Sequence, residues 1–166
     1  MKSVRTEIVV IGVRGGRAHT LLVRLPGSIW ALPGADVPAG NTLEAAARAA
    51  LQEQTGIRGA HLEQLYSFDR EGGAGVCVAQ LCLVASERHA LTPGPGVVEV
   101  RWFPMHDLPG LDADATAVLE YGRSRVRTKA AYAPIALHLL PEAFTLGELQ
   151  AVYEAVLGHG LDTRNF

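Results

Sequence analysis

The spacing of Ala50, Glu53 and Gln54 is the feature of this sequence that bears most directly on catalysis. In a helix these positions are i, i+3 and i+4, so three carboxylates there would share one face and could hold metal ions together. Divalent cations such as Mg²⁺ or Mn²⁺ activate water for hydrolysis, and they are held by several carboxylate oxygens. Here the face offers one carboxylate, one amide and one methyl group. We therefore predict no catalytic residue and no metal site on this helix.

The two cysteines provide no alternative chemistry. Cys77 and Cys82 lie five residues apart in an apolar run that we expect to be a strand, so their side chains point to opposite faces. A disulfide between them is geometrically disfavoured, and no Cys/His cluster has the spacing of a zinc site. We expect both to be small core residues.

Length, composition and charge are those of a compact globular protein. The chain has 166 residues, of which 48% are hydrophobic and 19% charged, and its formal net charge is −2. A stand-alone nucleic-acid binder would usually carry a basic excess, which is absent here. The first seven residues have no apolar signal core, and no run approaches the roughly 20 apolar residues that span a bilayer. We predict a cytoplasmic protein that does not bind membranes.

The first 110 residues are predicted to be rich in strands with one helix inserted. Gly15-Gly16 separates two apolar runs as in a hairpin, and a helix is expected at 114 to about 126. The expected strands are residues 7–13, 19–25, 29–32, 61–68, 75–86 and 97–103. This order favours an α+β sandwich with a mixed sheet.

The helix that carries Glu53 is predicted at 43–55, because its apolar residues recur at helical spacing. Asn41 is the expected N-cap, with Glu44 completing a capping box. Gly56 is placed to end the helix in the left-handed conformation.

The last third is predicted to be helical. Short helices are expected at 134–140 and 145–157, and Asp162 is placed to cap a third helix. Three short helices in succession are typical of a helix-turn-helix unit.

The stretch from Trp30 to Ile57 resembles the Nudix box, the signature of the Nudix hydrolases. That pattern is a glycine, five residues, a glutamate, seven residues, and then Arg-Glu-apolar-any-Glu-Glu-any-Gly-apolar. Every gap length is kept, but most of the acidic residues are not. The replacements are Ala35 for the glycine that opens the pattern, Asn41 for the first glutamate, Ala49-Ala50 for Arg-Glu, and Glu53-Gln54 for Glu-Glu.

The resemblance leaves three interpretations of the box open. Glu53 is a solvated helix residue, or a remnant that lines a ligand cleft without catalysing, or part of a working hydrolase that takes Mg²⁺ ligands from elsewhere. Carboxylates near 69–71 and 112–114 are the available outside ligands.

Residues 132–166 resemble the start of the winged helix in Nudix-related transcriptional regulators of NAD metabolism. The segments on which this resemblance rests are Phe-Thr-Leu-Gly-Glu-Leu-Gln at 144–150 and Leu-Asp-Thr-Arg-Asn-Phe at 161–166. The resemblance implies a homodimer with a Nudix α/β/α sandwich (1–128) that binds an ADP-ribose-like nucleotide. It implies an incomplete winged helix at 129–166.

In a helix-turn-helix scheme, residues 162–166 would begin the recognition helix. Thr163, Arg164 and Asn165 are then the DNA-contacting candidates, since arginine reads guanine and asparagine reads adenine. They are equally well explained as ordinary exposed residues. Because one helical turn is unstable alone, we predict weak or absent DNA binding by this chain.

The candidate ligand contacts are Arg24, Trp30 and Arg70. Trp30 could stack on an adenine or be a core aromatic, and the arginines could meet phosphates, although a solvated strand face is the simpler explanation for Arg24. We favour a non-catalytic nucleotide sensor. The alternatives are a hydrolase with recruited Mg²⁺ ligands and an interaction domain with an empty cleft.

Overall fold

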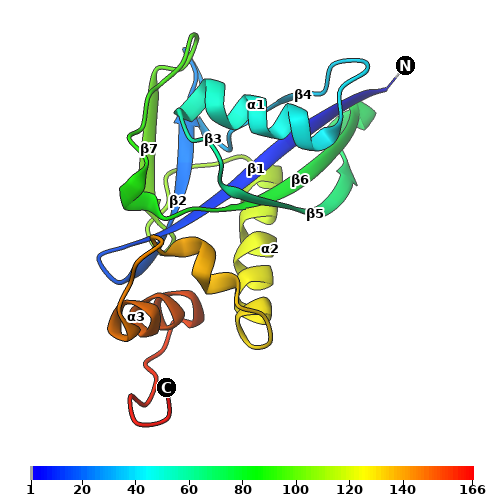
Figure 1. The fold of residues 1–166 in the computed structure, drawn as a ribbon. Helices are drawn as coiled ribbons and strands as arrows, with labels where there is room; N and C mark the ends of the chain where they lie inside the picture. The colour runs from blue at the N-terminus through cyan, green and yellow to red at the C-terminus, as the bar shows by residue number, and fades with distance from the viewer. Residues whose placement is uncertain (1) are drawn as a thin grey trace.

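A computed structural model describes residues 2–166 and shows one mixed sheet flanked by helices (Figure 1). The strand order is β3-β2-β1-β6-β5, with β4 also paired to β1 and β7 to β2. The strands are β1 (Ser3–Arg14), β2 (Arg17–Arg24), β3 (Trp30–Ala31), β4 (Gly34–Asp36), β5 (His61–Asp69), β6 (Gly75–Leu83) and β7 (Glu99–Pro104).

β1 is the central strand and makes the sheet mixed. It runs parallel to β6, from Ser3 opposite Gly75 to Ile11 opposite Leu83, whereas its pairings with β2 and β4 are antiparallel. The predicted hairpin is confirmed. Gly15 and Gly16 form its tip with φ of 55° and 72°, a turn that glycine adopts without steric cost.

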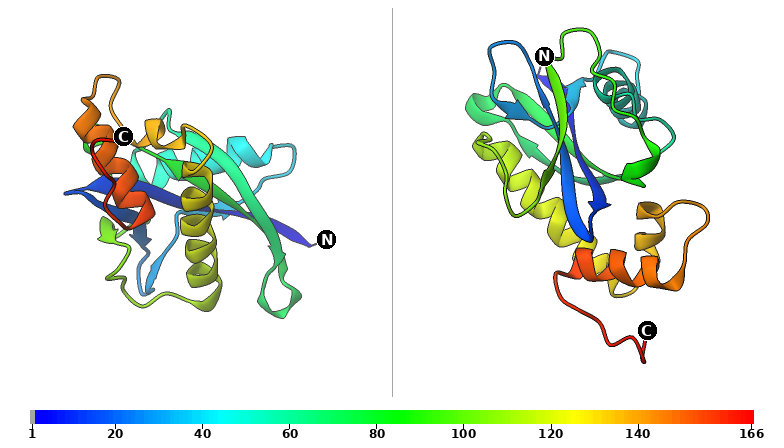
Figure 2. Two further views of the ribbon diagram at one scale, coloured as in Figure 1. Left: turned by 90° about the horizontal axis from the view of Figure 1, so that it is seen from below. Right: turned by 90° about the vertical axis from the view of Figure 1, so that its left-hand side faces the viewer.

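Two helices cover opposite faces of the sheet, α1 (Leu43–Thr55) and α2 (Ala113–Ala130) (Figures 1 and 2). Successive side chains of β1 point to alternate faces, so the strand packs against both helices. Ile8 and Val10 lie on the α1 side, and Val9 and Ile11 lie on the α2 side. The predicted α/β/α sandwich with a mixed sheet is therefore confirmed. Cys77 and Cys82 are free and buried. Because they are an odd number of residues apart in β6, their side chains lie on opposite faces of the sheet.

The predicted N-cap of α1 is wrong by one residue. Thr42 is the cap, and its hydroxyl accepts from the backbone N–H of Ala45 at 3.1 Å. The backbone N–H of Asn41 is instead bonded to Pro38 in the preceding turn, and Glu44 pairs with Arg48 rather than forming a capping box. Two adjacent cap formers made the assignment ambiguous. Gly56 ends the helix with φ of 82°, as predicted.

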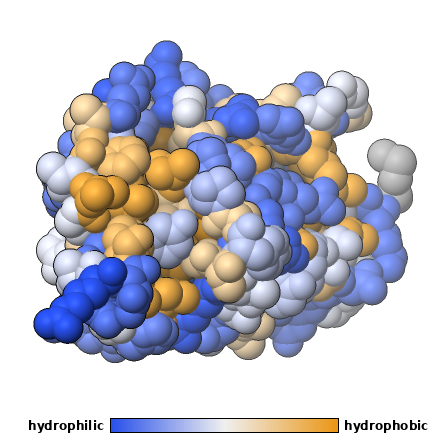
Figure 3. All heavy atoms as spheres, turned by 60° about the horizontal axis from the view of Figure 1, so that its bottom comes forward, coloured by the Kyte–Doolittle hydropathy of each residue, from blue (hydrophilic) through white to orange (hydrophobic). Residues whose placement is uncertain are grey.

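The C-terminal segment comprises a 3-10 helix, η3 (Ile135–Leu139), and α3 (Leu146–Leu157). Val152, Val156 and Ile135 join the hydrophobic cluster on the α2 side of the sheet. Other apolar residues of this segment are exposed, and the exposed fraction of Leu146 is 76%. Figure 3 shows a hydrophobic patch among hydrophilic residues on the lower face of the molecule. The division of the chain at 128/129 stays a prediction, and α2 runs across it.

The helix predicted to begin at Asp162 is absent from the structure. Residues 163–165 form a turn instead. The Asp162 carboxylate accepts from the backbone N–H of Arg164 at 3.0 Å and from the side-chain amide of Asn165 at 2.9 Å. Five residues cannot close enough backbone hydrogen bonds to repay helix nucleation. No helix among residues 2–166 is both long and apolar enough to cross a bilayer.

Candidate functional site

The end of α1 does not have the geometry of a metal site. Ala50 is 2% exposed and packs with Ile8, Val10 and Leu21 under the sheet. Glu53 is exposed and makes no hydrogen bond or ion pair with the residues that the structure describes. The box position at 50 therefore belongs to the core, and Glu53 is the one free carboxylate at this end of the helix.

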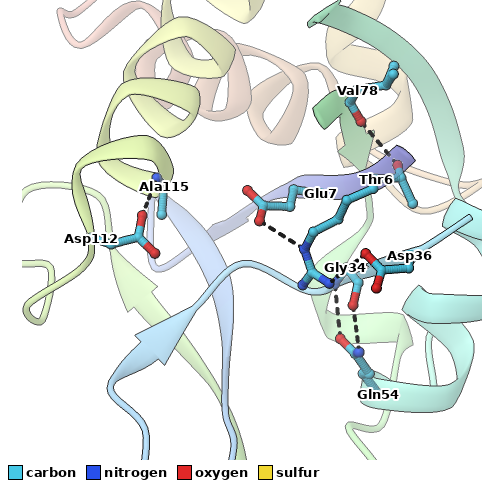
Figure 4. Close-up of polar contacts among 9 residues, drawn as sticks. Thr6, Glu7, Gly34, Asp36, Gln54, Val78, Asp112 and Ala115 are labelled. Atoms are coloured by element: carbon cyan, nitrogen blue, oxygen red, sulfur yellow. Dashed lines mark hydrogen bonds and ion pairs between the residues drawn. The ribbon is translucent and has the colours of Figure 1, made fainter. Parts of the chain in front are cut away.

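Gln54 makes two hydrogen bonds with the backbone of β4 (Figure 4). Its side-chain carbonyl accepts from the N–H of Gly34 at 3.0 Å, and its amide donates to the carbonyl of Gly34 at 2.9 Å. Only an amide can do both, because an ionised carboxylate has no proton to donate. A side chain at Gly34 would meet the backbone oxygen of Thr6 at 2.4 Å, so glycine permits the close approach of β4 to β1.

No group of three or more His, Cys, Asp or Glu side chains within residues 2–166 could hold a metal ion. The Mg²⁺ that a Nudix hydrolase would use has no matching donor set at the box helix. The residues present do not fit that metal, because position 50 is buried and apolar and position 54 is occupied by its contact with Gly34.

Charged side chains gather on the opposite face of the sheet, at the start of β1. The guanidinium of Arg5 lies 3.2 Å from the carboxylate of Glu7 and 3.9 Å from that of Asp36 (Figure 4). Alternation from Val9 and Ile11 places Arg5 and Glu7 on the α2 side. These residues were not predicted. The signal was two charges with a period of two, directly before the apolar run that begins at Ile8.

Cys77 lies beside this charged group, opposite Arg5 in the parallel ladder. Burial, and then the negative charge of Glu7, raise the pKa of the Cys77 thiol to about 12. The thiol therefore stays protonated near neutral pH and is not a nucleophile.

An aromatic wall adjoins Cys77 on the same side of the sheet. The ring of Tyr66 lies 4.4 Å from that of Tyr121 on α2 and 5.4 Å from that of Phe68, centroid to centroid. Burial raises the pKa of Tyr66, and the nearby Cys77 and Asp114 contribute in the same direction. The Tyr66 hydroxyl therefore remains a neutral hydrogen-bonding group.

Two predicted ligand contacts, Arg24 and Trp30, are brought together at the β2–β3 edge. They are register partners, and the guanidinium carbon of Arg24 lies 5.6 Å from the centre of the Trp30 ring. Arg101, which the sequence did not single out, approaches the same ring at 5.4 Å. Glu99 bonds both arginines, and the bond from Arg24 is the main reason that its pKa is lowered.

The ring of Trp30 is half-buried rather than free. It meets Phe103 edge-on at 4.8 Å between centroids and packs against the core on the α2 side. The two interpretations of Trp30 are thus both compatible with its position, because one part of the ring is core and the rest carries two guanidinium groups.

Arg70 is not brought together with the other two. It lies in the β5–β6 turn, at the opposite edge of the sheet from β3. It lines a pocket of about 220 Å³ together with Glu71, Ala74, Asp112, Ala113 and Asp114. Asp112 also caps α2 by accepting from the N–H of Ala115 at 2.7 Å (Figure 4). The outside carboxylates considered above therefore collect around Arg70 rather than around Glu53.

Thr163, Arg164 and Asn165 are exposed, as the DNA-contact prediction requires. Part of their hydrogen-bonding capacity is used within the chain, since the Thr163 hydroxyl accepts from the side-chain amide of Gln150 at 3.3 Å. Their proposed contacts with bases are untested.

Comparison with known proteins identifies both parts of the chain. The NUDIX domain family matches residues 4–121, and the NrtR DNA-binding winged helix domain matches residues 136–166. The ADPR responsive transcriptional repressor NtrR of Acinetobacter baylyi is 29% identical over an alignment of 172 positions, which covers 96% of this chain and 68% of that protein.

Solved structures agree with this match. The crystal structure of Shewanella oneidensis NrtR has a TM-score of 0.83 at 25% identity, covering 99% of this chain and 82% of that one. The same protein complexed with a 27mer DNA has a TM-score of 0.85 at 26% identity, covering 98% of this chain and 79% of that one. This chain belongs to the Nudix domain family, and its C-terminal residues match the NrtR winged helix.

Proposed function

We propose that this chain is a non-catalytic sensor of an ADP-ribose-like nucleotide and belongs to a transcriptional repressor of NAD metabolism. One observation supports the proposed absence of catalysis. The side chain of Gln54 bonds both backbone groups of Gly34, which leaves Glu53 as the one free carboxylate at the end of α1. The ligand class follows from the Acinetobacter relative, which is an ADPR responsive transcriptional repressor.

The nucleotide is proposed to lie on the α2 side of the sheet. Arg24 and Trp30 provide a cation and an aromatic surface at one place, which suits a phosphate next to an adenine. Arg5 and Arg101 lie on the same face, each beside a carboxylate, that of Glu7 or Glu99, and offer further guanidinium donors.

Arg70 is the third proposed contact, and it serves a different part of the ligand. It is separated from Trp30 by three to four strand spacings, roughly 14–19 Å across the sheet. The carboxylates of Glu71, Asp112 and Asp114 around it repel phosphate but accept hydrogen bonds from sugar hydroxyls. We therefore assign Arg70 and its pocket to the distal ribose.

Calorimetric titration with ADP-ribose, with and without Mg²⁺, tests this function when product release is followed in the same samples. We expect saturable binding without turnover, and about tenfold weaker binding for Arg24→Gln. Arg58→Gln is the matched control, because Arg58 is exposed and its side chain makes no hydrogen bond or ion pair with residues 2–166. Metal-dependent cleavage by the unmodified chain would instead establish the hydrolase alternative.

DNA binding is proposed for the repressor as a whole, through Thr163, Arg164 and Asn165. The support is the winged-helix match and the Shewanella structure with a 27mer DNA. In this chain Asp162 holds Arg164 and Asn165 in a turn, so we expect weak or absent binding. Fluorescence anisotropy with duplex DNA at two salt concentrations measures it, and a salt-sensitive nanomolar complex would contradict the expectation.

A homodimer remains part of the proposal, because symmetric operators are bound by two-fold symmetric proteins. Sedimentation of the purified chain at several concentrations tests it. A cytoplasmic location likewise stays a prediction.

A further inference from the structure

A second pocket lies where the Nudix fold meets α3, far in sequence from the box. It has a volume of about 340 Å³ and is formed by the β1–β2 tip, the end of β7, α2 and the last turn of α3. We call it the junction pocket. Its polar lining residues are Arg17, His106, Arg123, Arg127, Glu154 and His159. Figure 2 shows α3 packed beneath the sheet and beside α2 in two views.

The junction pocket carries an excess of positive charge. Three arginines line it against one carboxylate, that of Glu154. This carboxylate is already used, because it accepts from the backbone N–H of Leu161 at 2.8 Å and from the amide of Gln150 at 3.0 Å. Those two bonds lower the pKa of Glu154 and hold it in the C-terminal turn. Within residues 2–166 it forms no ion pair with an arginine, and three arginines against one carboxylate leave an excess of positive charge.

Two of the arginines retain free donors. Arg17 contacts the imidazole of His106 at 3.3 Å, and because arginine only donates, that ring nitrogen must be the acceptor. Arg17 has no carboxylate within 4.0 Å among residues 2–166, and Arg123 has only Glu120 at 3.8 Å on the helix surface. Arg127 differs, since its Nε donates to the carbonyl of Val156 at the end of α3.

The rest of the lining is apolar. Ile11, Ala18, Met105 and Val126 form the wall from the sheet and α2. A pocket of this size with apolar walls and a few convergent cations has the features of a small-molecule site. A bare inorganic anion would leave those walls unused.

We propose that the junction pocket binds an organic phosphate, with Arg17 and Arg123 on the phosphate and Met105 and Val126 against the organic part. This site goes beyond the proposed nucleotide site, because it shares no residue with the Arg24–Trp30 edge. It joins Arg17 and His106, which lie in the Nudix match, to His159, which lies in the winged-helix match. A ligand that fills the pocket also contacts its α3 side, at Ala155 and Val156, and so stabilises the docking of α3 on the sheet domain.

Calorimetric titration with adenosine monophosphate and with inorganic phosphate tests the proposal. We expect saturable binding of adenosine monophosphate at one site, weaker binding of inorganic phosphate, and at least about tenfold loss for the double variant Arg17→Gln/Arg123→Gln. Arg58→Gln should bind as the unmodified chain does. Slower amide hydrogen exchange in α3 on addition of adenosine monophosphate is the second expected result.

Three outcomes would overturn the proposal. The first is no saturable binding up to about 10 mM ligand. The second is equal loss in Arg58→Gln, which would indicate non-specific charge attraction. The third is loss on Arg24→Gln with competition by ADP-ribose, which would assign the binding to the β2–β3 edge. ADP-ribose titration of the double variant keeps the two proposals separate, since that affinity should not change.

Discussion

Helices α1 and α3 are built alike at their ends but are held in different ways. Each begins at a threonine N-cap, Thr42 or Thr145, and ends at a left-handed glycine, Gly56 or Gly158. α1 buries three alanines and a leucine against the sheet, whereas α3 buries only Val152 and Val156. Near its start α3 leaves Leu146 76% exposed.

The difference shows where each helix obtains its stability. The place of α1 is fixed by tertiary contacts: its alanines allow close packing, and the side chain of Gln54 is bonded to Gly34. α3 relies more on its own capping box, in which Thr145 and Glu148 exchange hydrogen bonds. Changes in α1 should therefore affect the whole fold, and changes in α3 mainly its own docking.

Restoring a glutamate at position 50 should have the largest effect. Ala50→Glu would place a carboxylate in a site that is 2% exposed and lined by Ile8 and Val10. We expect a loss of about 3 kcal/mol or more in the free energy of unfolding, because the charge has no partner there. Urea denaturation measures it. Ala49→Glu, on the exposed side of the same helix, should change little, and similar losses in both would show that position 50 is not core.

Gln54→Glu should have the next largest effect. The substitution removes the donor to the carbonyl of Gly34 and sets a carboxylate oxygen against it. We expect a loss of about 2 kcal/mol in unfolding free energy. Gln52→Glu, which adds the same charge at an exposed position of α1, is the control. If Mg²⁺ restored the stability of Gln54→Glu, the two carboxylates at 53 and 54 would form a metal site after all.

These two tests concern a part of the fold that the sequence largely predicts. The bounds 43–55 of α1 are correct because helical periodicity and Gly56 are local signals. The contact of Gln54 with Gly34 could not be predicted, since it joins residues 20 apart and depends on how β4 packs against the helix.

The candidate site was only partly predictable for the same reason. Arg24 and Trp30 were predicted separately as ligand contacts, and only the register of β2 and β3 makes them neighbours. Arg5 and Glu7 were missed because surface charges and site charges look alike in a strand sequence until the facing helix is known. The charges of the junction pocket come from four separate elements, so no motif marks them.

Thr145→Ala tests the local character of α3. Removing the hydroxyl that accepts from the backbone N–H of Glu148 should cost about 1 kcal/mol. Amide exchange should accelerate in α3 and not in α1, whereas Thr128→Ala, whose hydroxyl makes no hydrogen bond among the described residues, should leave both unchanged. Equal acceleration in the two helices would mean that they unfold together.

The smallest expected effect is a pH dependence in the contact of η3 with β5. The ring of His138 stacks on that of His61 at 3.8 Å, and His61 also meets Glu63, which Lys129 holds by two hydrogen bonds. Burial, and then the neighbouring His61, lower the pKa of His138 below its ordinary value of 6.5, although Glu63 opposes the shift.

The unfolded chain therefore takes up this proton at a higher pH than the folded chain does. Stability from His138 is fully present above pH 6.5 and is lost as the pH falls from 6.5 through the lower, folded pKa. We expect the urea midpoint of the unmodified chain to fall more steeply over this range than that of His138→Gln. The pKa of His89 is also lowered, but His89 is present in both proteins, so its contribution cancels in the comparison. Parallel pH profiles would show that the stacked pair does not respond to protonation.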